Sequence, residues 1–268
     1  MRVVALCGYI GIGIGVLFSS FTLRHLEVVF LDVGQGDAIL VTSPSGRQIL
    51  IDAGVNQRIL RALGKEMSFF DRGIDVVLAT HPDADHIGGF PAVFERFDIE
   101  RVVRTEAVSE TSIYEAFVSG SSEAEVVYLS RGSVIDLGAG VYVQVLFPLE
   151  GMVAGGNDGS IVAKVIYGDT SFLLTGDAGI GVEEYVIQEE GDLLASDVLK
   201  AGHHGSRTST SEEFVSVVSP EVSIISAGED NYYGHPHEEV LERLSVYLET
   251  SKEGNITFVS DGERLWRE

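Results

Sequence analysis

The stretch Thr80-His81-Pro82-Asp83-Ala84-Asp85-His86-Ile87-Gly88-Gly89 contains two histidines and two aspartates within six residues. It follows the apolar run 76–79, which is typical of a buried strand. Imidazole and carboxylate side chains on a loop after a strand are the ligands that a pair of metal ions requires. In an extended loop, His81, Asp83 and Asp85 would point to one side because they alternate. His86 would add a ligand where the next helix begins. The alternative is a solvated surface turn.

Two later strands also end in potential ligands. The apolar run 171–174 leads through Thr175-Gly176 to Asp177, and the run 197–200 leads to His203 and His204. Sites assembled from several strand ends are common in layered folds of strands and helices. We therefore expect the three segments to form one site. Asp177 could bridge two metal ions. Of the two histidines, His204 is the predicted ligand and His203 is predicted to line the site or act on the substrate.

The composition is that of an acidic globular chain. Its 268 residues suffice for one large domain or two small ones, and 45% of them are hydrophobic. The formal net charge is −23, from 18 basic and 41 acidic residues. Such a chain is not suited to extended nonspecific contact with nucleic-acid phosphates, which requires Lys and Arg. A polyanionic substrate must therefore be held locally, by metal ions and a few basic groups. The single cysteine, Cys7, excludes an internal disulfide and a thiolate zinc site.

The N-terminal segment is apolar. Residues 3–23 contain no charged side chain, and this length matches the roughly 20 residues of a membrane helix. We predict a membrane anchor or signal segment at 1–24 and one further domain at 25–268. A cleaved signal peptide would give a secreted protein, and a buried core helix is a third interpretation. One arginine on each side, Arg2 and Arg24, leaves the orientation open.

The rest of the chain alternates between strand and helix patterns. Three strands at 26–31, 38–42 and 48–51 should form an antiparallel meander. A strand at 75–80 leads into the metal loop, and a helix at 88–97 follows it. Beyond a hairpin at 160–174, helices are expected at 182–188, 212–218 and 238–247. After residue 25 the sequence has no repeat, linker or low-complexity segment, so we expect one soluble domain.

Seven short motifs are distributed over almost the whole chain from residue 26 onward. They are Asp32-Val33-Gly34-Gln35-Gly36-Asp37, Asp52-Ala53-Gly54, His81-x-Asp83-x-Asp85-His86, Asn157-Asp158-Gly159-Ser160, Thr175-Gly176-Asp177, Lys200-x-x-His203-His204-Gly205-Ser206 and Tyr233-Gly234-His235-Pro236-His237. With these motifs the chain resembles the metallo-β-lactamase superfamily, and within it the hydrolase domain of ComEC-type competence proteins, which act in DNA uptake. The resemblance implies an α+β fold, a four-layer αβ/βα sandwich with a dinuclear metal site at one edge. It covers only the hydrolase part, because the full competence proteins also have a multi-span channel region.

Two departures from the wider superfamily affect the expected metal site. Its metal loop usually reads His-x-His-x-Asp-His, whereas Asp83 stands here in place of the second histidine. No histidine occurs between His86 and His203, and Asn157 or Asp158 lies where one is expected. The resulting oxygen-rich set suits Mn²⁺ at least as well as Zn²⁺. The resemblance implies two divalent metal ions, one held by His81, Asp83 and Asp177, and the other by Asp85, His86, His204 and Asp177.

Catalysis would use a metal-activated water, because paired cations lower the pKa of a bridging water and stabilise developing charge. By resemblance, Asp85 is also the proton acceptor. Lys200 and Arg207 flank the histidine pair and could bind a phosphate oxygen, unless they are ordinary surface residues. His235 precedes the predicted helix at 238–247, whose N-terminus could receive an anion; capping is the alternative. The expected catalytic residues are thus Asp85, Lys200 and His203, and the expected substrate-binding residues are Asn157, Arg207 and His235.

The leading functional hypothesis is a membrane-tethered, metal-dependent phosphodiesterase, a nuclease that acts on incoming DNA. Its domain would lie on the outer side of the cytoplasmic membrane, with a separate channel protein as a partner. The acidic charge supports an alternative, a hydrolase of a non-nucleic-acid ester that is similar to phosphorylcholine esterase or to lactonases. A third hypothesis is a non-catalytic component of a DNA-uptake complex.

Overall fold

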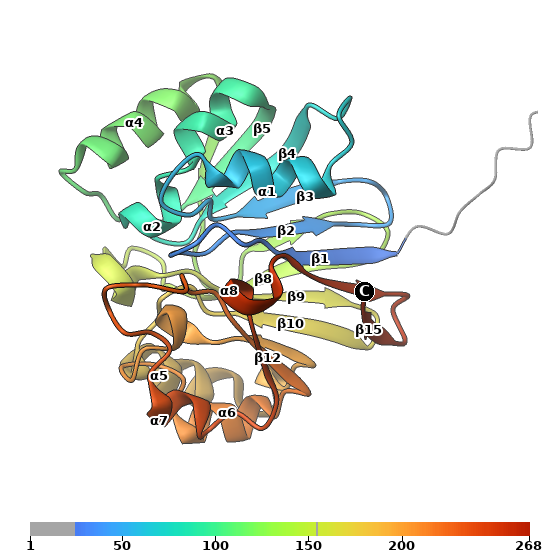
Figure 1. The fold of residues 1–268 in the computed structure, drawn as a ribbon, viewed down its shortest axis with the longest axis vertical. Helices are drawn as coiled ribbons and strands as arrows, with labels where there is room; N and C mark the ends of the chain where they lie inside the picture. Colours follow the sequence, from blue (N-terminus) through green and yellow to red (C-terminus); the bar gives the residue numbers. More distant parts are fainter. Residues whose placement is uncertain (1–24, 154) are drawn as a thin grey trace, which may run out of the picture.

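Two β-sheets packed face to face form the middle of the molecule, and helices cover the outer face of each sheet (Figure 1). The computed structural model describes residues 25–153 and 155–268, so the anchor predicted at residues 1–24 lies outside the described residues. In this described part, no helix is both long and apolar enough to span a bilayer. The order helix, sheet, sheet, helix confirms the predicted four-layer αβ/βα sandwich.

The first sheet has the strand order β15-β14-β1-β2-β3-β4-β5-β6. The meander is confirmed, because β2 pairs antiparallel with both β1 and β3. From β3 to β6 all neighbours are parallel. The strands are β1 (Leu26–Phe30), β2 (Ile39–Thr42), β3 (Gln48–Ile51), β4 (Gly73–Ala79), β5 (Asp98–Arg104), β6 (Glu125–Tyr128), β14 (Ile256–Ser260) and β15 (Leu265–Arg267). The helices of this half are α1 (Arg58–Glu66), α2 (Ala84–Ile87), α3 (Phe90–Arg96) and α4 (Ser112–Gly120).

The second sheet has the order β13-β12-β11-β10-β9-β8-β7, in which β10 to β13 are parallel. Its strands are β7 (Val134–Asp136), β8 (Val141–Phe147), β9 (Val162–Tyr167), β10 (Thr170–Leu174), β11 (Val198–Lys200), β12 (Val222–Ile225) and β13 (Tyr247–Glu249). The helices α5 (Ile180–Glu190), α6 (Glu212–Val218), α7 (Glu238–Leu241) and α8 (Thr250–Glu253) belong to this half.

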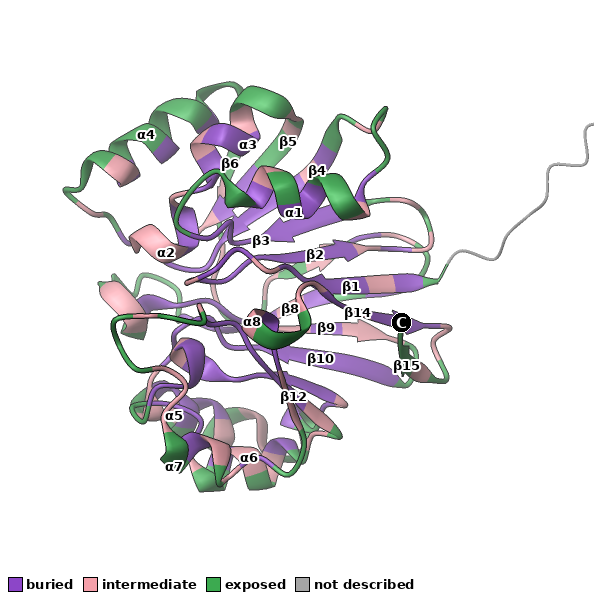
Figure 2. Cartoon of the chain, viewed as in Figure 1, coloured by how far each residue is buried: buried purple, intermediate pink, exposed green. Residues whose placement is uncertain are grey.

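Successive side chains of a strand point to opposite faces of its sheet, so each face carries its own apolar layer. Val28 and Val41 of the first sheet pack between the sheets with Val165 and Phe172 of the second. The intervening residues, such as Leu40, face the helices instead. Because both faces are covered, the central strands such as β1, β3 and β10 are buried almost throughout, whereas the edge strands β6, β7 and β15 are not (Figure 2). The site loops therefore stand on a sheet framework that is packed from both sides.

One helix prediction was wrong. The helix expected at 238–247 ends at Leu241, and the chain continues into strand β13, which pairs in parallel with β12. Edge pairing supplies backbone hydrogen bonds to residues 247–249 and places Leu248 against the core between the sheets. These long-range contacts override the local helical pattern, which contains nothing that reports a neighbouring strand.

The parallel arrangement brings the carboxyl ends of five strands to one edge of the sandwich. β1 and β3 are both antiparallel to β2, so they point the same way, and β4 is parallel to β3. In the second sheet β10 and β11 are parallel. The two halves meet at this edge, where Ile161 N donates a hydrogen bond to the carbonyl oxygen of Thr80 at 3.0 Å. The three motifs expected to form one site are on loops at this edge.

Candidate metal centre

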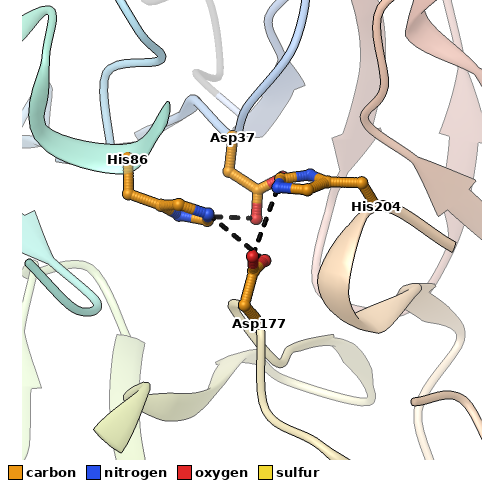
Figure 3. A group of neighbouring side chains, drawn as sticks. All are labelled: Asp37, His86, Asp177 and His204. Atoms are coloured by element: carbon orange, nitrogen blue, oxygen red, sulfur yellow. Dashed lines mark ion pairs between the residues drawn. The ribbon is translucent and has the colours of Figure 1, made fainter. Parts of the chain in front are cut away.

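Four buried side chains, Asp37, His86, Asp177 and His204, converge at this edge (Figure 3). One ligand atom from each lies within 4.8 Å of the others. Asp37 ends the turn after β1 and His86 belongs to α2, whereas Asp177 follows β10 and His204 follows β11. Asp177 lies at the centre, with Oδ1 3.2 Å from His86 Nε2 and Oδ2 3.3 Å from His204 Nε2. Each half of the sandwich thus supplies one aspartate and one histidine.

Both histidines direct Nε2 into the cluster, and Nδ1 of each ring contacts a hydrogen-bond acceptor behind it. His86 Nδ1 lies 2.7 Å from Asp52 Oδ2, and His204 Nδ1 lies 2.8 Å from the carbonyl oxygen of Ser226. A carboxylate and a carbonyl only accept hydrogen bonds, so each Nδ1 carries a proton, and the neutral ring would offer the lone pair of Nε2 to a metal ion. Each Nε2 faces a carboxylate oxygen of Asp177. That contact requires positive charge, either a proton on Nε2 or a metal ion between the two atoms.

The unsatisfied atoms at the cluster fit a metal ion. Within residues 25–153 and 155–268, the buried atoms without a hydrogen-bond partner include His81 Nε2, His86 Nε2, His204 Nε2 and Asp177 Oδ1. Buried polar atoms are rarely left without a partner, and such a group requires a cause. Imidazole nitrogens and carboxylate oxygens that converge in this way are suitable ligands for a divalent cation. The donor set therefore fits a divalent metal ion.

The charges around the cluster also favour a cation. Burial by itself lowers the pKa of His86, but the Asp177 and Asp52 carboxylates raise it well above its ordinary value. Burial likewise opposes the raised pKa of His204, which results from Asp177 and Asp37. For Asp177, burial favours the protonated form, yet His204 and His86 hold its pKa well below the usual range. The carboxylates thus stay ionised and attract positive charge.

The metal loop is helical rather than extended, which corrects the geometry predicted from residue alternation. Asp83 caps the N-terminus of α2 with extended backbone, and Asp85 lies inside the helix. Asp85 Oδ2 is 3.2 Å from His204 Nε2, so it joins the cluster. His81 Nε2 is 3.7 Å from Asp83 Oδ2, and the Asp83 side chain is 45% exposed. The predicted ligands thus form two neighbouring groups that meet at Asp177.

The second group contains a neutral imidazole. Burial and the neighbouring His86 lower the pKa of His81 to about 3. Its Nδ1 contacts Thr80 Oγ1 at 3.1 Å and Ser160 Oγ at 3.3 Å, so its Nε2 is directed towards Asp83. Ser160 Oγ also accepts a hydrogen bond from Asp177 N at 3.1 Å. Ser160 therefore links the two groups.

Asp52 orients the cluster from behind. Its carboxylate accepts hydrogen bonds from His86 Nδ1 at 2.7 Å, from Thr80 N at 2.8 Å and from Thr80 Oγ1 at 2.7 Å. The backbone of Asp52 has a φ of +58°, in the left-handed region that costs a non-glycine residue energy. This conformation turns the buried carboxylate towards His86. The Asp52-Ala53-Gly54 motif thus fixes the tautomer of a predicted ligand.

The adjacent histidines separate because both adopt left-handed backbone conformations. His203 has a φ of +47° and His204 a φ of +57°. His204 points into the cluster, whereas the His203 side chain is 26% exposed, with Nε2 3.9 Å from Asp177 Oδ2. Asn157 Nδ2 lies 3.2 Å from His203 Nε2. Asn157 and His203 therefore lie together at the mouth of the site, as expected of residues that line it.

Lys200 has a different position from the one predicted. Its side chain is 0% exposed, which excludes the surface-lysine interpretation. Nζ lies 2.5 Å from Asp37 Oδ2 and donates to the carbonyl oxygen of Gly176 at 2.9 Å. An ammonium that is enclosed in this way neutralises Asp37 and cannot reach a phosphate in solvent. The predicted phosphate contact is therefore corrected to a buried ion pair.

Of the residues around the mouth of the site, Arg207 and His235 lie where a substrate could reach them. Arg207 is 58% exposed and lies 3.4 Å from Glu239 Oε1, so it remains free to reach a ligand. The ring of His235 lies 5.5 Å from that of His203. The prediction that a helix N-terminus receives an anion after His235 is wrong. Helix α7 has only four residues, and its first two are glutamates, whose negative charge repels an anion. His237 instead stabilises the local chain turn, because its Nδ1 accepts a hydrogen bond from Arg207 N.

Asp37 was missed by the sequence prediction. It was quoted within the Asp32–Asp37 motif but was not assigned as a ligand. The signal was present, because Asp37 closes a glycine-rich turn directly after an apolar strand, as Asp177 does. Gly36 has a φ of +113°, and a Cβ there would lie 2.0 Å from the carbonyl oxygen of Asp85. The glycine thus allows the turn to pack directly against the metal loop.

Comparison with known proteins agrees with this geometry. The profile of the metallo-beta-lactamase superfamily matches residues 31–229, which include the four cluster residues. The chain belongs to the metallo-β-lactamase superfamily. It is 32% identical to ComE operon protein 3 of Bacillus subtilis (strain 168) over 92% of this chain and 35% of that protein. It is 31% identical to the competence protein ComA of Neisseria gonorrhoeae over 88% of this chain and 32% of that protein.

These relatives place the chain in the ComEC-type branch of the metallo-β-lactamase superfamily. The chain spans about a third of the length of the two relatives. A solved structure, the metallo-beta-lactamase fold protein YhfI from Bacillus subtilis, superposes with a TM-score of 0.57 and 10% identity, over 91% of this chain and all of that one. This likeness shows the fold. Family and buried cluster together assign the chain to the metal-dependent hydrolases of the superfamily.

Proposed function

We propose that the chain is a metal-dependent phosphodiesterase that cleaves DNA during DNA uptake. The observation that supports this most is the oxygen-rich ligand set around Asp177, in which Asp83 and Asp85 stand beside the histidines. Oxygen-rich sites suit the metal ions that commonly serve phosphoryl chemistry. The relationship to a competence protein supports DNA as the substrate.

Seven side chains would hold two divalent metal ions, Mn²⁺ or Zn²⁺. Asp177 would be shared between the ions, because its two oxygens face different histidines. Bound metal ions would supply a water of lowered pKa and positive charge for the phosphate oxygens. The proposed ligands are His81, Asp83, Asp85, His86, Asp177 and His204 from the sequence prediction, with Asp37 added from the structure.

The residues at the mouth would act on the substrate. Asp85 is 26% exposed. Burial raises its pKa, but the hydrogen bond to His204 and the charge of His86 lower it by more, so the carboxyl group is ionised. The proposed role of Asp85 as proton acceptor rests on its position at the mouth and on the resemblance. Burial lowers the pKa of His203, which keeps the ring neutral and able to donate or accept one hydrogen bond. Asn157 orients His203, and Arg207 would bind a phosphate oxygen from the rim.

The test compares three substrates under defined metal conditions. The full chain is incubated with single-stranded DNA, with plasmid and with small esters (a phosphorylcholine ester and a lactone), in Mn²⁺, Zn²⁺ or EDTA. Wild-type protein should cleave DNA with Mn²⁺ and not with EDTA, and Asp85→Ala should lower the rate at least about a hundredfold. Asp169→Ala, an exposed turn residue between β9 and β10, is the matched control and should cleave normally. DNA that stays intact under all metal conditions would refute the proposal.

The acidic surface favours one alternative function. A formal charge of −23 opposes extended contact with DNA, so a hydrolase of a small non-nucleic-acid ester remains the second candidate. Turnover of phosphorylcholine esters or lactones without DNA cleavage would identify it. Binding to uptake proteins without turnover of any substrate would instead indicate a non-catalytic component.

The proposed location follows from the apolar segment. Residues 3–23 would tether the domain to the outer side of the cytoplasmic membrane, where a separate channel protein would receive the DNA. Membrane fractionation of the chain with and without residues 1–24 tests this tether. Recovery of the full chain in the soluble fraction would contradict it.

A further inference from the structure

Residues 229–237, here called the aromatic arm, carry a row of flat side chains from the candidate metal centre to solvent. Tyr232 is 99% exposed and Tyr233 is 62% exposed. Tyr233 stacks on His235 with ring centroids 5.6 Å apart and planes 23° from parallel. His235 in turn lies 5.5 Å from His203, at the mouth of the site. The rings thus form a continuous path from the cluster to the surface.

The arm is held firmly at both ends. Before it, Gly228 N donates to Gln35 Oε1 at 3.1 Å, in the glycine-rich turn that ends at Asp37. Inside it, Asn231 Oδ1 accepts from His235 N at 2.9 Å. At its end, His237 N donates to the carbonyl oxygen of Gly205 at 2.9 Å, next to His204. The backbone of the arm and the Tyr233 ring, which stacks on His235, are therefore held relative to the cluster, which lowers the entropy lost on binding.

The chemistry of the arm fits a nucleobase better than a phosphate backbone. The sequence of residues 229–237 contains two acidic residues, Glu229 and Asp230, and no lysine or arginine. A cleft of about 490 Å³ beside the arm is lined by the same two residues and Asp32, with Arg58 as its cation, so it repels a polyanion. Stacking on an aromatic ring requires no positive charge and tolerates every base. Stacking can thus supply affinity for nucleic acid that the charge of the arm cannot supply.

We infer that Tyr232 and Tyr233 bind an unpaired nucleobase of single-stranded nucleic acid, next to the phosphodiester group at the cluster. The inference rests on the proposed phosphodiesterase function and adds the class of substrate. Bases inside a duplex already have neighbours on both faces, whereas an unstacked base offers a free face to a tyrosine ring. The arm therefore selects single strands over duplexes at the step of binding.

Binding is measured without cleavage, by fluorescence anisotropy in EDTA with a labelled oligothymidine. The double variant Tyr232→Ala/Tyr233→Ala should bind about fivefold to a hundredfold more weakly than wild type. The matched variant Tyr232→Phe/Tyr233→Phe keeps the rings and should bind within about twofold of wild type. An abasic strand of equal length keeps the phosphates, and it should bind weakly and equally to all three proteins.

Several results would overturn the inference. The first is that wild type does not bind oligothymidine measurably. The second is that wild type and the alanine variant bind it equally. The third is that the phenylalanine and alanine variants lose the same amount of affinity for it. Loss of binding to phosphatidylcholine vesicles in the alanine variant, with unchanged binding of oligothymidine, would make the arm a membrane contact instead.

A second measurement separates this inference from the proposed function. In Mn²⁺, wild type and the alanine variant should cleave the abasic strand at equal rates, because the arm has no base to hold. Cleavage of no strand by wild type, combined with tyrosine-dependent binding in EDTA, would refute the phosphodiesterase and leave a nucleic-acid binding module. Cleavage of the abasic strand that falls with the tyrosines would contradict base stacking.

Discussion

Asp177 is the residue on which the candidate centre depends most. It is almost fully buried, and its two oxygens face His86 and His204 from opposite halves of the sandwich. A carboxylate in this position keeps two imidazoles aligned and supplies negative charge for cations. Its amide counterpart would keep the shape and lose the charge.

Asp177→Asn should therefore abolish metal binding while the protein stays folded. A neutral amide no longer attracts a cation and offers one oxygen where the carboxylate offers two. We expect bound metal, measured by elemental analysis after dialysis, to fall from two ions per chain to less than one. Asp169→Asn, on the exposed turn between β9 and β10, should retain two. Two ions retained by Asp177→Asn, or one ion bound by wild type, would contradict the dinuclear proposal.

The Asp37–Lys200 pair predicts a stability effect instead of a direct catalytic one. Removal of one member of a buried ion pair leaves the other charge without a partner and costs about 3–5 kcal/mol. Lys200→Met should lower the free energy of unfolding, measured by urea denaturation, by about this amount. The double variant Lys200→Met/Asp37→Asn should recover part of the loss, because no unpaired charge remains. Unchanged stability of Lys200→Met would show that Asp37 has another cation partner.

At the scale of elements, the loop after β11 is held by two neighbouring segments. The Glu183 carboxylate of α5 accepts hydrogen bonds from the backbone N–H groups of Thr210 and Ser211. Arg243, after α7, donates to the carbonyl oxygen of Thr210 at 3.0 Å. These contacts satisfy a buried loop whose histidines adopt strained left-handed conformations. The helices of the second half thus keep His203 and His204 in place.

Glu183 should make stability depend on pH. Burial raises the pKa of Glu183 above its ordinary value of 4.5, although its N–H donors oppose this. Because the folded pKa is higher than the unfolded one, the contribution is present below pH 4.5 and is lost as pH rises through the folded pKa. The stability of wild type relative to Glu183→Gln should therefore fall over this interval and stay constant above it. Urea denaturation from about pH 4 to about pH 8 checks this.

The exposed neighbour Glu184 provides the control for this measurement. It lies on the solvent side of α5, so Glu184→Gln should leave the pH profile of wild type unchanged. Parallel profiles for wild type and Glu183→Gln over the whole range would show that burial does not perturb the Glu183 carboxyl group.

At the scale of the whole molecule, the cluster joins the two halves of the sandwich. Asp37 and His86 come from the first half, and Asp177 and His204 come from the second (Figure 3). The same edge holds carboxylate oxygens and imidazole nitrogens that face one another, and a divalent cation can bind to both kinds of atom. A bound metal ion should therefore stabilise the association of the halves, and so the entire fold.

Metal removal should lower thermal stability. A ligand at a hundred times its Kd stabilises a folded protein by about 2.7 kcal/mol. We expect Mn²⁺ at that excess to raise Tm relative to the protein in EDTA, as measured by differential scanning calorimetry. Asp177→Asn should show no such shift, because the cluster no longer holds the ion. Equal Tm values for wild type with Mn²⁺ and with EDTA would argue against a metal site between the halves.

Much of the fold could be predicted because its signals are local. The apolar runs before Asp52, His81 and Asp177 each became a strand, and the glycine-rich turns ended where expected. The helix at 238–247 was wrong because pairing with β12 decides the conformation of residues 247–249. The extended geometry of the metal loop was wrong because the helical turn α2 begins at Ala84, directly after Asp83, and contains Asp85. For residues 247–249, a contact outside the segment outweighed the pattern within it.

The sequence by itself determined the kinds of ligand, their order along the chain and their positions at strand ends. These properties follow from local chemistry and from periodicity. Only the tertiary structure decided that Asp37 joins the cluster and that Lys200 is its buried partner. It also decided that Asp52 sets the tautomer of His86, and that two tyrosines extend from the site. Each of these depends on how two sheets pack together, and no local pattern encodes a distance between residues that lie far apart in the chain.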